Sequence, residues 1–322
     1  MTTDVSKLQG NGMKAVRVHE YGGAEVLVVE DVPVPALAAD HLLVKVRACG
    51  INPLDAWFRS GHLAARFPRP LPYTPGSDVV GTVAQRGSNV TSFEVGDWVM
   101  GILPPLADGG YAEYVVAEAG RFAALPAGLD PVRAAAGMTP GVTGLQLLDK
   151  AMSIRNCRHI LLVGALGAVG RAAMIRAVEK GVQVTAVVLS GDEHKATLLG
   201  AENVLTADSL PPAGEIAGRF DCILDTAGPE AVAPWEQGLA AGGVVISIVP
   251  LPPASFVRTD IEMMPFAYSP DPQSLTEAAK LIQSGKLGDP GIETLSLHET
   301  GKAHALLPGA AGGRKFVVVP HE

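Results

Sequence analysis

The chain has 322 residues, of which 48% are hydrophobic and 18% are charged, and this length exceeds what one ordinary hydrophobic core accommodates. Such a composition is typical of a folded two-domain protein and excludes a disordered scaffold. The formal net charge of −8, without any basic block, argues against nucleic acid and anionic membrane surfaces as partners.

Targeting and disulfide signals are missing from the sequence. No apolar run is long enough to cross a bilayer, and the start lacks the charged-then-apolar pattern of a signal peptide. The cysteines Cys49, Cys157 and Cys222 have neither metal-ligand spacing nor the number needed for a disulfide framework. We therefore expect a cytoplasmic protein.

The first third of the chain has a β pattern. Residues 1–12 are polar, and we expect a flexible tail there. From residue 13 to about residue 126, short segments with alternating or β-branched hydrophobic residues are separated by Gly and Pro, which predicts a mostly β domain with long loops. The predicted strands are Lys14–Val18, Leu42–Val46, Val79–Val83, Trp98–Met100 and Tyr111–Val116.

The pattern changes near Asp130, where helices begin to alternate with strands. One helix is predicted to start at Pro131, and a second to run from about Val142 to Ala151. The alternation predicts βαβ units and a parallel sheet covered on both faces. The remaining predicted elements are strands over 159–163, 182–189, 221–224, 244–249 and 316–319, and helices over 168–180 and 275–284.

A glycine-rich turn separates the strand over 159–163 from the following helix. Free backbone N–H groups at a helix start face outward there and can bind a phosphate. One glycine allows close approach of a pyrophosphate and another allows tight helix–strand packing, although Ala stands at the usual first glycine position. We expect cofactor phosphate binding at Gly164, Ala165, Gly167, Ala168 and Val169, with Gly170 in the packing role.

Cofactor preference is encoded at the end of the next strand. NAD-dependent sites usually have a carboxylate there that accepts from the ribose 2′-hydroxyl. This chain has Ser190 instead, followed by Lys195, and a hydroxyl and a cation favour a 2′-phosphate. Asp192 and Glu193 oppose this preference because either could reach the ribose. We expect NADPH in preference to NADH.

Five motifs, in this order and spacing, carry a family resemblance. The chain resembles the zinc-free quinone oxidoreductases, the zeta-crystallin-like branch of the medium-chain dehydrogenase/reductase superfamily, from about residue 13 to residue 319. The motifs are Asn52-Pro53-Leu54-Asp55 with Arg59-Ser60-Gly61, the stretch 71–83, Gly96-Asp97-Trp98-Val99, Gly109-Gly110-Tyr111-Ala112-Glu113-Tyr114, and 220–228 ending in Asp225-Thr226-Ala227-Gly228.

The resemblance implies an α/β fold with two domains. It predicts a GroES-like, mostly β catalytic domain over residues 13–139 and 268–322, and a Rossmann domain with a doubly wound parallel sheet over residues 140–267. It also implies that Asn52 and Ser77 stand where zinc-dependent relatives have metal ligands. Neither residue is a normal zinc ligand, so we expect no zinc and no other metal.

The resemblance places four candidate catalytic residues in the first domain. Asn52 is expected to donate to a substrate carbonyl and Asp55 to orient its neighbours, although both could instead cap a helix. The family often has a Tyr two residues after this Asp and another after the next Gly, but this chain has Trp57 and Leu63. Trp57 could stack on a ring, and His62 is the nearest titratable replacement, so the proton donor stays open.

Further cofactor contacts follow from the resemblance and from strand ends. Thr143 matches the family's threonine beside the nicotinamide. Ala227, Gly228, Val249 and Pro250 follow two predicted parallel strands, and ligands bind beyond the carboxyl ends of such strands.

The leading hypothesis is an NADPH-dependent reductase of quinones or α,β-unsaturated carbonyls. The alternatives are an enoyl-thioester reductase of a biosynthetic pathway, a cofactor-binding protein with little turnover, and a non-redox role. The expected partner is a small-molecule substrate. We also expect a homodimer, in which the strand over 244–249 pairs with its copy.

Overall fold

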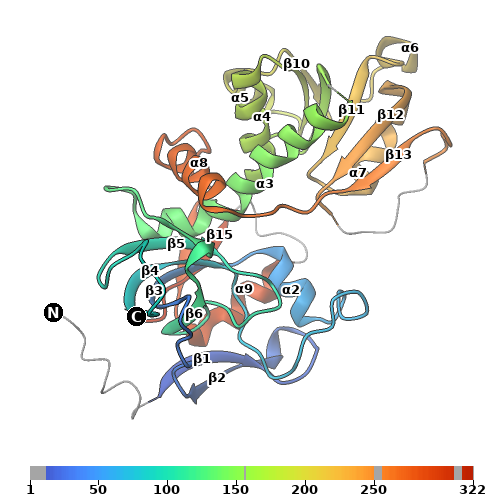
Figure 1. Cartoon of the computed structure of the whole chain (residues 1–322). Coiled ribbons are helices and arrows are strands. Elements are labelled where there is room, and N and C mark those ends of the chain that lie inside the picture. The colour runs from blue at the N-terminus through green and yellow to red at the C-terminus, as the bar shows by residue number, and fades with distance from the viewer. Residues whose placement is uncertain (1–11, 156, 250–255, 308–313, 322) are drawn as a thin grey trace. The chain divides into compact units, whose positions relative to one another are not determined.

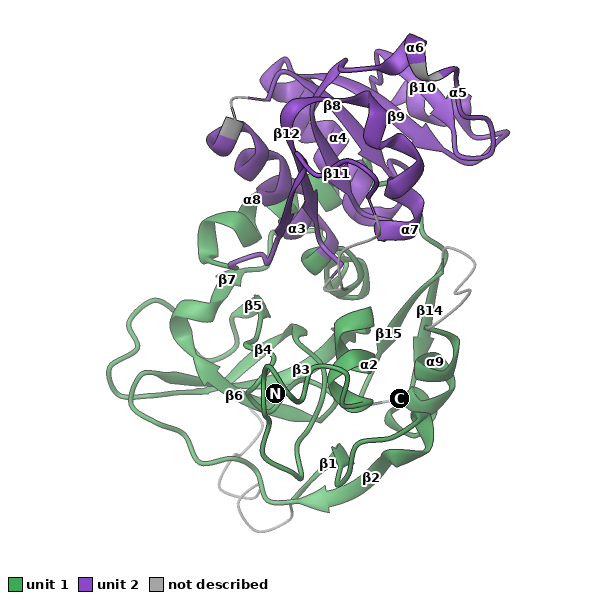
Figure 2. Cartoon of the chain, turned by 90° about the vertical axis from the view of Figure 1, so that its right-hand side faces the viewer, with its two compact units in different colours: residues 1–139, 270–322 green, residues 140–269 purple. Residues whose placement is uncertain are grey.

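The computed structural model describes residues 12–155, 157–249, 256–307 and 314–321, and the chain divides into two compact units. Unit 1 comprises residues 1–139 and 270–322, and unit 2 comprises residues 140–269 (Figure 2). The expected N-terminal tail lies outside the described residues, apart from Gly12.

Unit 1 is built on a seven-stranded sheet, as expected for a GroES-like, mostly β domain (Figure 1). Its strand order is β14-β15-β3-β4-β5-β7, and β6 adds to β3. Only β14 and β15 pair in parallel. The strands are β3 His41–Gly50, β4 Asp78–Arg86, β5 Trp98–Ile102, β6 Tyr114–Glu118, β7 Phe122–Ala124, β14 Ile292–Leu295 and β15 Lys315–Val318.

Unit 1 also contains a hairpin and several helices. Alternating side chains of β3, such as Leu42, Val44 and Val46, point into its main core. The strand predicted over 111–116 begins only at Tyr114, because the N–H groups of residues 109–111 donate instead to the carbonyls of residues 74–76. The additional elements are β1 Met13–Val18, β2 Leu27–Val32, α2 Pro53–Arg59, α8 Pro272–Gln283, α9 Thr300–Leu306 and short 3₁₀ turns at Ala24–Val26, Ala119–Arg121 and Leu297–Glu299.

Unit 2 contains a six-stranded parallel sheet in the order β10-β9-β8-β11-β12-β13. From β8 the chain moves outward to one edge, then returns to β11 and moves to the other edge, so β8 and β11 flank the switch point where Rossmann folds bind ligands. The strands are β8 His159–Val163, β9 Gln183–Val188, β10 Asn203–Thr206, β11 Phe220–Asp225, β12 Leu239–Ser247 and β13 Glu262–Pro265.

Helices cover both faces of this sheet, which confirms the doubly wound prediction. Ile160 and Leu162 of β8 pack on one face with residues of α3, α4 and α5. Leu161 and Val163 pack on the opposite face with Ile216, Val232 and Trp235. The covering elements are α4 Ala168–Lys180, α5 Glu193–Leu198, α6 Ala213–Ile216, α7 Pro229–Val232 and a 3₁₀ turn at Ala233–Gly238.

The two helices predicted after residue 131 are one helix, α3, Pro131–Arg155. Pro140 lies inside it and removes the hydrogen bond to the carbonyl four residues earlier. The proline ring nevertheless fixes φ in the helical range, so the helix continues. The first part of α3 belongs to unit 1 and the part from Pro140 onward to unit 2.

The expected pairing of the strand over 244–249 with its copy is wrong. Residues 244–247 of this segment lie on β12, where they pair with β11 on one side and with β13 on the other. No sequence pattern predicts β13, whose residues Glu262–Pro265 pair in parallel with Val244–Ser247 and form one edge of the sheet.

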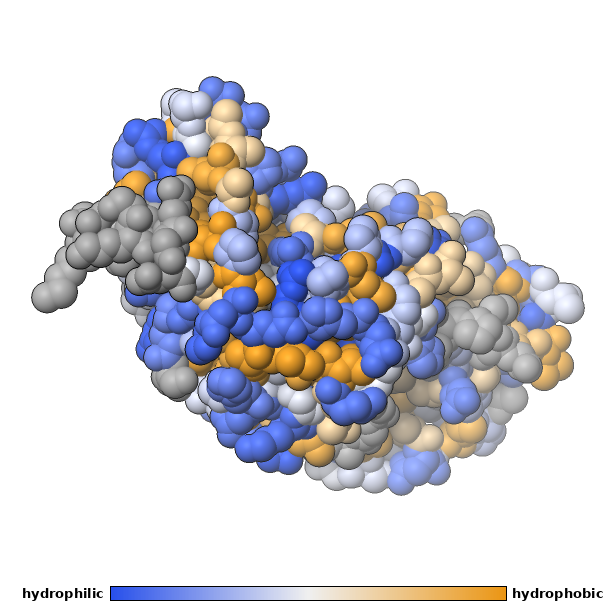
Figure 3. Space-filling view, turned by 90° about the horizontal axis from the view of Figure 1, so that it is seen from below, coloured by the Kyte–Doolittle hydropathy of each residue, from blue (hydrophilic) through white to orange (hydrophobic). Residues whose placement is uncertain are grey.

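The outer surface mixes polar and apolar side chains. The face shown in Figure 3 carries a narrow band of hydrophobic residues bordered by polar ones. Among the described residues, no helix has the length and apolar character required to span a membrane.

Candidate active site

The start of α2 places Asn52 and Asp55 beside β3, β4 and β15 in unit 1. The backbone N–H of Ile51 donates to Phe316 of β15 at 3.0 Å, which fixes the chain between β3 and α2. Pro53 opens the helix, and the Asn52 backbone N–H donates to Asp55 Oδ2 at 2.8 Å. Asp55 thus stabilises the first turn, while the Asn52 side chain is directed to other partners.

The Asn52 carboxamide is held from both ends. Lys315 Nζ donates to Asn52 Oδ1 at 2.5 Å and to the Ile51 carbonyl at 2.7 Å. Asn52 Nδ2 donates to Asp78 Oδ2 at 3.1 Å. Lysine has only donors and a carboxylate only acceptors, so the positions of oxygen and nitrogen in this amide are determined by their partners.

Asp78 is fully buried at the first position of β4. Besides Asn52, Thr139 donates to it through both its backbone N–H and its hydroxyl. Burial raises the pKa of Asp78, while Lys315 lowers it. Burial likewise lowers the pKa of Lys315, and the two acids oppose this. The three groups form a compact, mutually dependent set of charges.

A second chain of hydrogen bonds continues from Asp55 into the core. The hydroxyl of Tyr111, which is fully buried, donates to Asp55 Oδ2 at 3.3 Å and lies 3.1 Å from Nε2 of His304 on α9. Burial is the largest influence on Asp55 and raises its pKa to about 6. Burial also lowers the pKa of His304 to about 3, so this imidazole is neutral at physiological pH.

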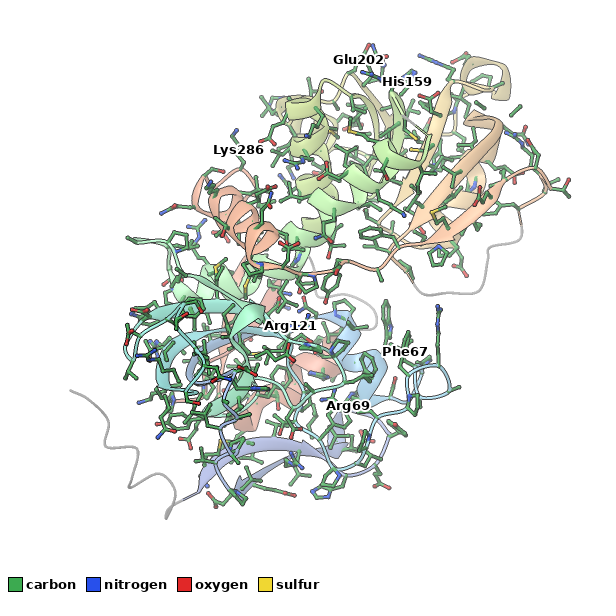
Figure 4. All side chains as sticks on the ribbon, in the orientation of Figure 1. Phe67, Arg69, Arg121, His159, Glu202 and Lys286 are labelled. Atoms are coloured by element: carbon green, nitrogen blue, oxygen red, sulfur yellow. The ribbon has the colours of Figure 1, made fainter. Side chains whose placement is uncertain are left out.

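The other two predicted catalytic residues of unit 1 are not part of this network. Trp57 is half-buried on α2, and His62 is exposed, with its Nδ1 2.8 Å from the Ser60 hydroxyl. The loop that follows α2 is anchored by buried Arg69, which donates to the carbonyls of Pro105, Thr74 and Ala107. Phe67 is exposed on the same loop, and Figure 4 shows both residues.

In unit 2 the predicted glycine loop has the geometry of an anion site. It follows β8 at the carboxyl end of the sheet, opposite His159 and Glu202 (Figure 4). Gly164 has φ +81°, and a Cβ at Gly170 would lie 2.3 Å from the Gly164 carbonyl oxygen. Gly167 caps α4 without a side chain, so the first-turn N–H groups of Ala168 and Val169 are left for a ligand. These residues fit the pyrophosphate of a dinucleotide.

Buried Asp225 organises the neighbouring loops at the carboxyl ends of β11 and β12. Its Oδ1 accepts from the backbone N–H groups of Ala227 at 3.0 Å and Gly228 at 2.7 Å. Its Oδ2 accepts from Ser247 Oγ at 2.6 Å. The Ser247 hydroxyl oxygen in turn accepts from the Val249 N–H at 3.1 Å. One carboxylate thereby brings together three predicted cofactor residues.

Thr226 and Thr143 border the same loop. Thr226 donates to the Val163 carbonyl at 2.8 Å, next to Gly164. Thr143 is buried on α3, where a Cβ at the adjacent Gly144 would be 2.3 Å from the Val169 carbonyl oxygen. The structure thus holds Thr143 beside the start of α4. Pro250 lies outside the described residues.

The predicted ligands of the 2′-phosphate both contact carboxylates. Ser190 Oγ is 2.6 and 2.8 Å from the two oxygens of Asp208, which follows β10. Lys195 Nζ pairs with Asp192 at 2.5 Å. The opposing charge of Asp192 is visible in the sequence, but that of Asp208 is not, since only the pairing of β9 with β10 brings this residue to Ser190.

Sequence reasoning also misses the charged and polar partners that fix the unit 1 site. The motif around Tyr111 indicates a packing residue, and Lys315 stands just before the last predicted strand. The sequence does contain one signal for Lys315: it is a lysine directly before the buried hydrophobic run Phe316–Val319. The missed residues are Asp78, Tyr111, His304 and Lys315 in unit 1 and Asp225 and Ser247 in unit 2.

Comparison with known proteins identifies relatives of this chain. The alcohol dehydrogenase GroES-like domain family matches residues 38–127. The "Quinone-oxidoreductase homolog, chloroplastic" of Spinacia oleracea is 31% identical over 268 residues, covering 80% of this chain and 78% of that protein. The quinone oxidoreductase of Homo sapiens is 38% identical over 187 residues, covering 58% of this chain and 56% of that protein.

A solved structure extends the similarity over nearly the whole chain. The quinone oxidoreductase from Coxiella burnetii is 28% identical, with a TM-score of 0.81 and coverage of 95% of this chain and 99% of that chain. Together with the GroES-like unit and the Rossmann-like sheet, these similarities establish an oxidoreductase with a nicotinamide cofactor. The chain belongs to the quinone oxidoreductase branch of the medium-chain dehydrogenase/reductase superfamily.

Proposed function

We propose that the protein is a zinc-free reductase that takes hydride from NADPH and reduces a quinone or an α,β-unsaturated carbonyl compound. The observation that carries this proposal is the fixed carboxamide of Asn52. The names of the relatives support the substrate class, and the glycine loop of unit 2 supports the cofactor.

Asn52 can act as an oxyanion donor because its orientation is determined. Its Oδ1 accepts from Lys315, and one Nδ2 proton is given to Asp78. The second Nδ2 proton has no partner among the described residues and can be donated to a substrate oxygen. When bound, the nicotinamide supplies the hydride, and negative charge then develops on that oxygen. A preoriented donor backed by a lysine stabilises this charge without reorganisation.

The absence of zinc is part of the proposal. Lys315 directs its ammonium group at the only oxygen that the Asn52 side chain offers. A divalent cation at this position would face a positive charge, and neither Asn52 nor Ser77 supplies the sulfur or imidazole that zinc prefers. Within the described ranges, no group of three or more His, Cys, Asp or Glu residues is arranged to hold a metal ion.

The preference for NADPH is expected to be modest. Ser190 and Lys195 offer a hydroxyl and a cation, and an exposed ion pair such as Lys195–Asp192 is worth about 1 kcal/mol or less, so a phosphate can compete for the lysine. Asp208 opposes the preference, because its hydrogen bond from Ser190 lowers its pKa and keeps it charged. A 2′-phosphate at this place would meet a carboxylate.

A homodimer and a small-molecule substrate, without nucleic acid or membrane partners, complete the proposal. We take β13 as the strand that pairs across a two-fold axis, because it forms one of the two edges of the unit 2 sheet, beside the strand first expected to pair. Sedimentation of wild type and of a Met263→Pro variant tests this, because proline lacks the N–H that edge pairing requires. A monomeric wild type would refute the dimer.

The reductase is tested by following oxidation of NADPH, and then of NADH, against benzoquinone, phenanthrenequinone, an alkyl enone and crotonyl-CoA. We expect turnover with NADPH that EDTA does not reduce. Preference for crotonyl-CoA would instead favour an enoyl-thioester reductase. In Asn52→Leu, which keeps the side-chain volume but has no donor, turnover should fall about 100-fold while NADPH binding is unchanged. Tight NADPH binding without turnover of any acceptor would refute the reductase.

A further inference from the structure

The positions where the family often has tyrosines carry no ordinary proton donor in this chain. Trp57 and Leu63 replace the tyrosines of the family, and an indole N–H is not an acid at neutral pH. Tyr73 and Tyr111 are poor acids, since burial raises the pKa of Tyr73 to about 12 and raises that of Tyr111 well above its usual value. His62 is exposed and contacts Ser60.

Asp55 differs from these groups because its two oxygens have different surroundings. Oδ2 accepts from the Asn52 N–H at 2.8 Å and from the Tyr111 hydroxyl at 3.3 Å. Oδ1 has no hydrogen-bond partner among the described residues, and unlike their fully buried unpartnered polar atoms it retains some exposed area. The residue is 6% exposed, so this exposure leaves Oδ1 as the oxygen within reach of a small molecule.

The surroundings of Asp55 increase the fraction of its carboxyl group that is protonated near neutrality. Burial raises its pKa to about 6, and the carboxylate of Asp78 adds to this, while Lys315 and Tyr111 lower it. These groups come from several packed elements. The titratable and charged groups around Asp55 are Asp78 of β4, Lys315 of β15, Cys49 of β3, Tyr73 and Tyr111 of two loops, Arg69 of the loop after α2 and, beyond Tyr111, His304 of α9 and Arg59 of α2.

We propose that Asp55, through Oδ1, is the general acid that protonates the enolate formed from an unsaturated carbonyl substrate. This inference rests on the reductase activity proposed above. Hydride addition at the β-carbon moves the C=C electron pair toward the carbonyl oxygen and gives an enolate. The Asp55 Oδ1–H bond then breaks, its proton forms a C–H bond at the α-carbon, and solvent reprotonates the carboxylate.

Tyr111 and His304 are positioning residues in this scheme. The Tyr111 hydroxyl occupies Oδ2 and leaves the proton of Asp55 on Oδ1. His304 fixes that hydroxyl at 3.1 Å and, with a pKa of about 3, does not itself deliver a proton. A reduced quinone carries its charge on a phenolate oxygen, which water protonates, so only carbon protonation requires Asp55.

The test compares two acceptors, an enone and benzoquinone, in two variants. Asp55→Asn keeps an oxygen that can accept from Asn52 and Tyr111, and we expect its enone turnover to fall about 100-fold, a much larger loss than the one it causes with benzoquinone. Asp40→Asn, which alters an exposed carboxylate bound to Asn89, is the matched control and should change neither rate. NADPH fluorescence and thermal unfolding check that each variant folds and binds cofactor.

The pH profile gives a second, independent readout. A general acid works when protonated, so enone turnover should fall as pH rises through about 6, and this limb should vanish in Asp55→Asn. Tyr111→Phe removes a donor that lowers the pKa of Asp55, so the limb should move to higher pH. If Tyr111 were merely structural, Tyr111→Phe would lower activity without changing the pH at which enone turnover falls.

The outcomes separate the two proposals. If Asp55→Asn reduces the enone at the wild-type rate with the wild-type pH profile, Asp55 is not the acid, although the reductase stands. Equal loss with both acceptors would also overturn the inference, because it would place Asp55 in hydride transfer or folding. A wild type that oxidises NADPH with neither acceptor would overturn both proposals.

Discussion

The two units prepare their sites by different physical means. In unit 2 the glycine loop presents backbone N–H groups, and small residues matter because they leave room. In unit 1 a half-buried lysine, two buried carboxylates and an amide hold one another in place. The backbone site of unit 2 therefore tolerates the loss of a nearby charge but not an added side chain. The side-chain site of unit 1 is sensitive to the loss of any partner and to a change in its net charge.

Removing the lysine should break the unit 1 site with the largest effect. Lys315→Met leaves Asp55 and Asp78 without the cation that lowers their pKa values, and the fold should lose about 3 kcal/mol. Turnover should fall at least about 100-fold because Asn52 loses its fixed orientation. Thermal unfolding and steady-state rates measure both effects, with exposed Lys302→Met as the matched control. Wild-type turnover in Lys315→Met would show that Asn52 needs no lysine.

Added volume should break the unit 2 site with an intermediate effect. In Gly170→Ala the new Cβ would approach the Gly164 carbonyl oxygen to 2.3 Å, so the loop must shift. We expect the Kd for NADPH to rise at least about 10-fold, a loss of about 1.4 kcal/mol in binding. Gly214→Ala, where a Cβ meets nothing within 4 Å, is the control. Equal binding by both variants would argue against a close backbone approach at this loop.

The smallest effect should come from a charge in the otherwise backbone-based site. Asp208→Asn removes the carboxylate beside Ser190, and the preference for NADPH over NADH should rise about 3-fold, as for an exposed charge contact. Because such contacts are screened, the gain should shrink in high salt. The ratio of kcat/KM values for the two cofactors measures it, with exposed Glu215→Gln for comparison. An unchanged ratio would place the 2′-phosphate away from Asp208.

The contrast between the two sites also explains which of them can be predicted from the sequence. Gly164, Gly167 and Gly170 are neighbours in the chain, so their spacing alone predicts the loop. The partners of Asn52 are Asp78, 26 positions away, and Lys315, 263 positions away. No local pattern marks such pairs, because they meet only when β3, β4 and β15 join one sheet.

Two wrong predictions have the same origin. The sequence pattern leaves β12 at a sheet edge because β13 is short and irregular, and it divides α3 at Pro140 because proline usually ends a helix. In both cases the local sequence pattern is present, but structure outside it decides the result: β13 covers the edge of β12, and the helix continues on both sides of Pro140. Asp225 is visible in a motif, but its bonds to two loops depend on the parallel pairing of β11 and β12.

The long separation between Lys315 and Asn52 has a consequence for biosynthesis. During translation, β3, α2 and β4 emerge well before β15. Asp55 and Asp78 therefore lack Lys315 as a neighbour until β15 pairs with the end of β3, Val317 with Gly50 and Val318 with Cys49. Closing so long a loop is among the slower steps of folding. The charge set of unit 1 is therefore completed late, by the chain itself, and once in place it cannot be removed by a chelator.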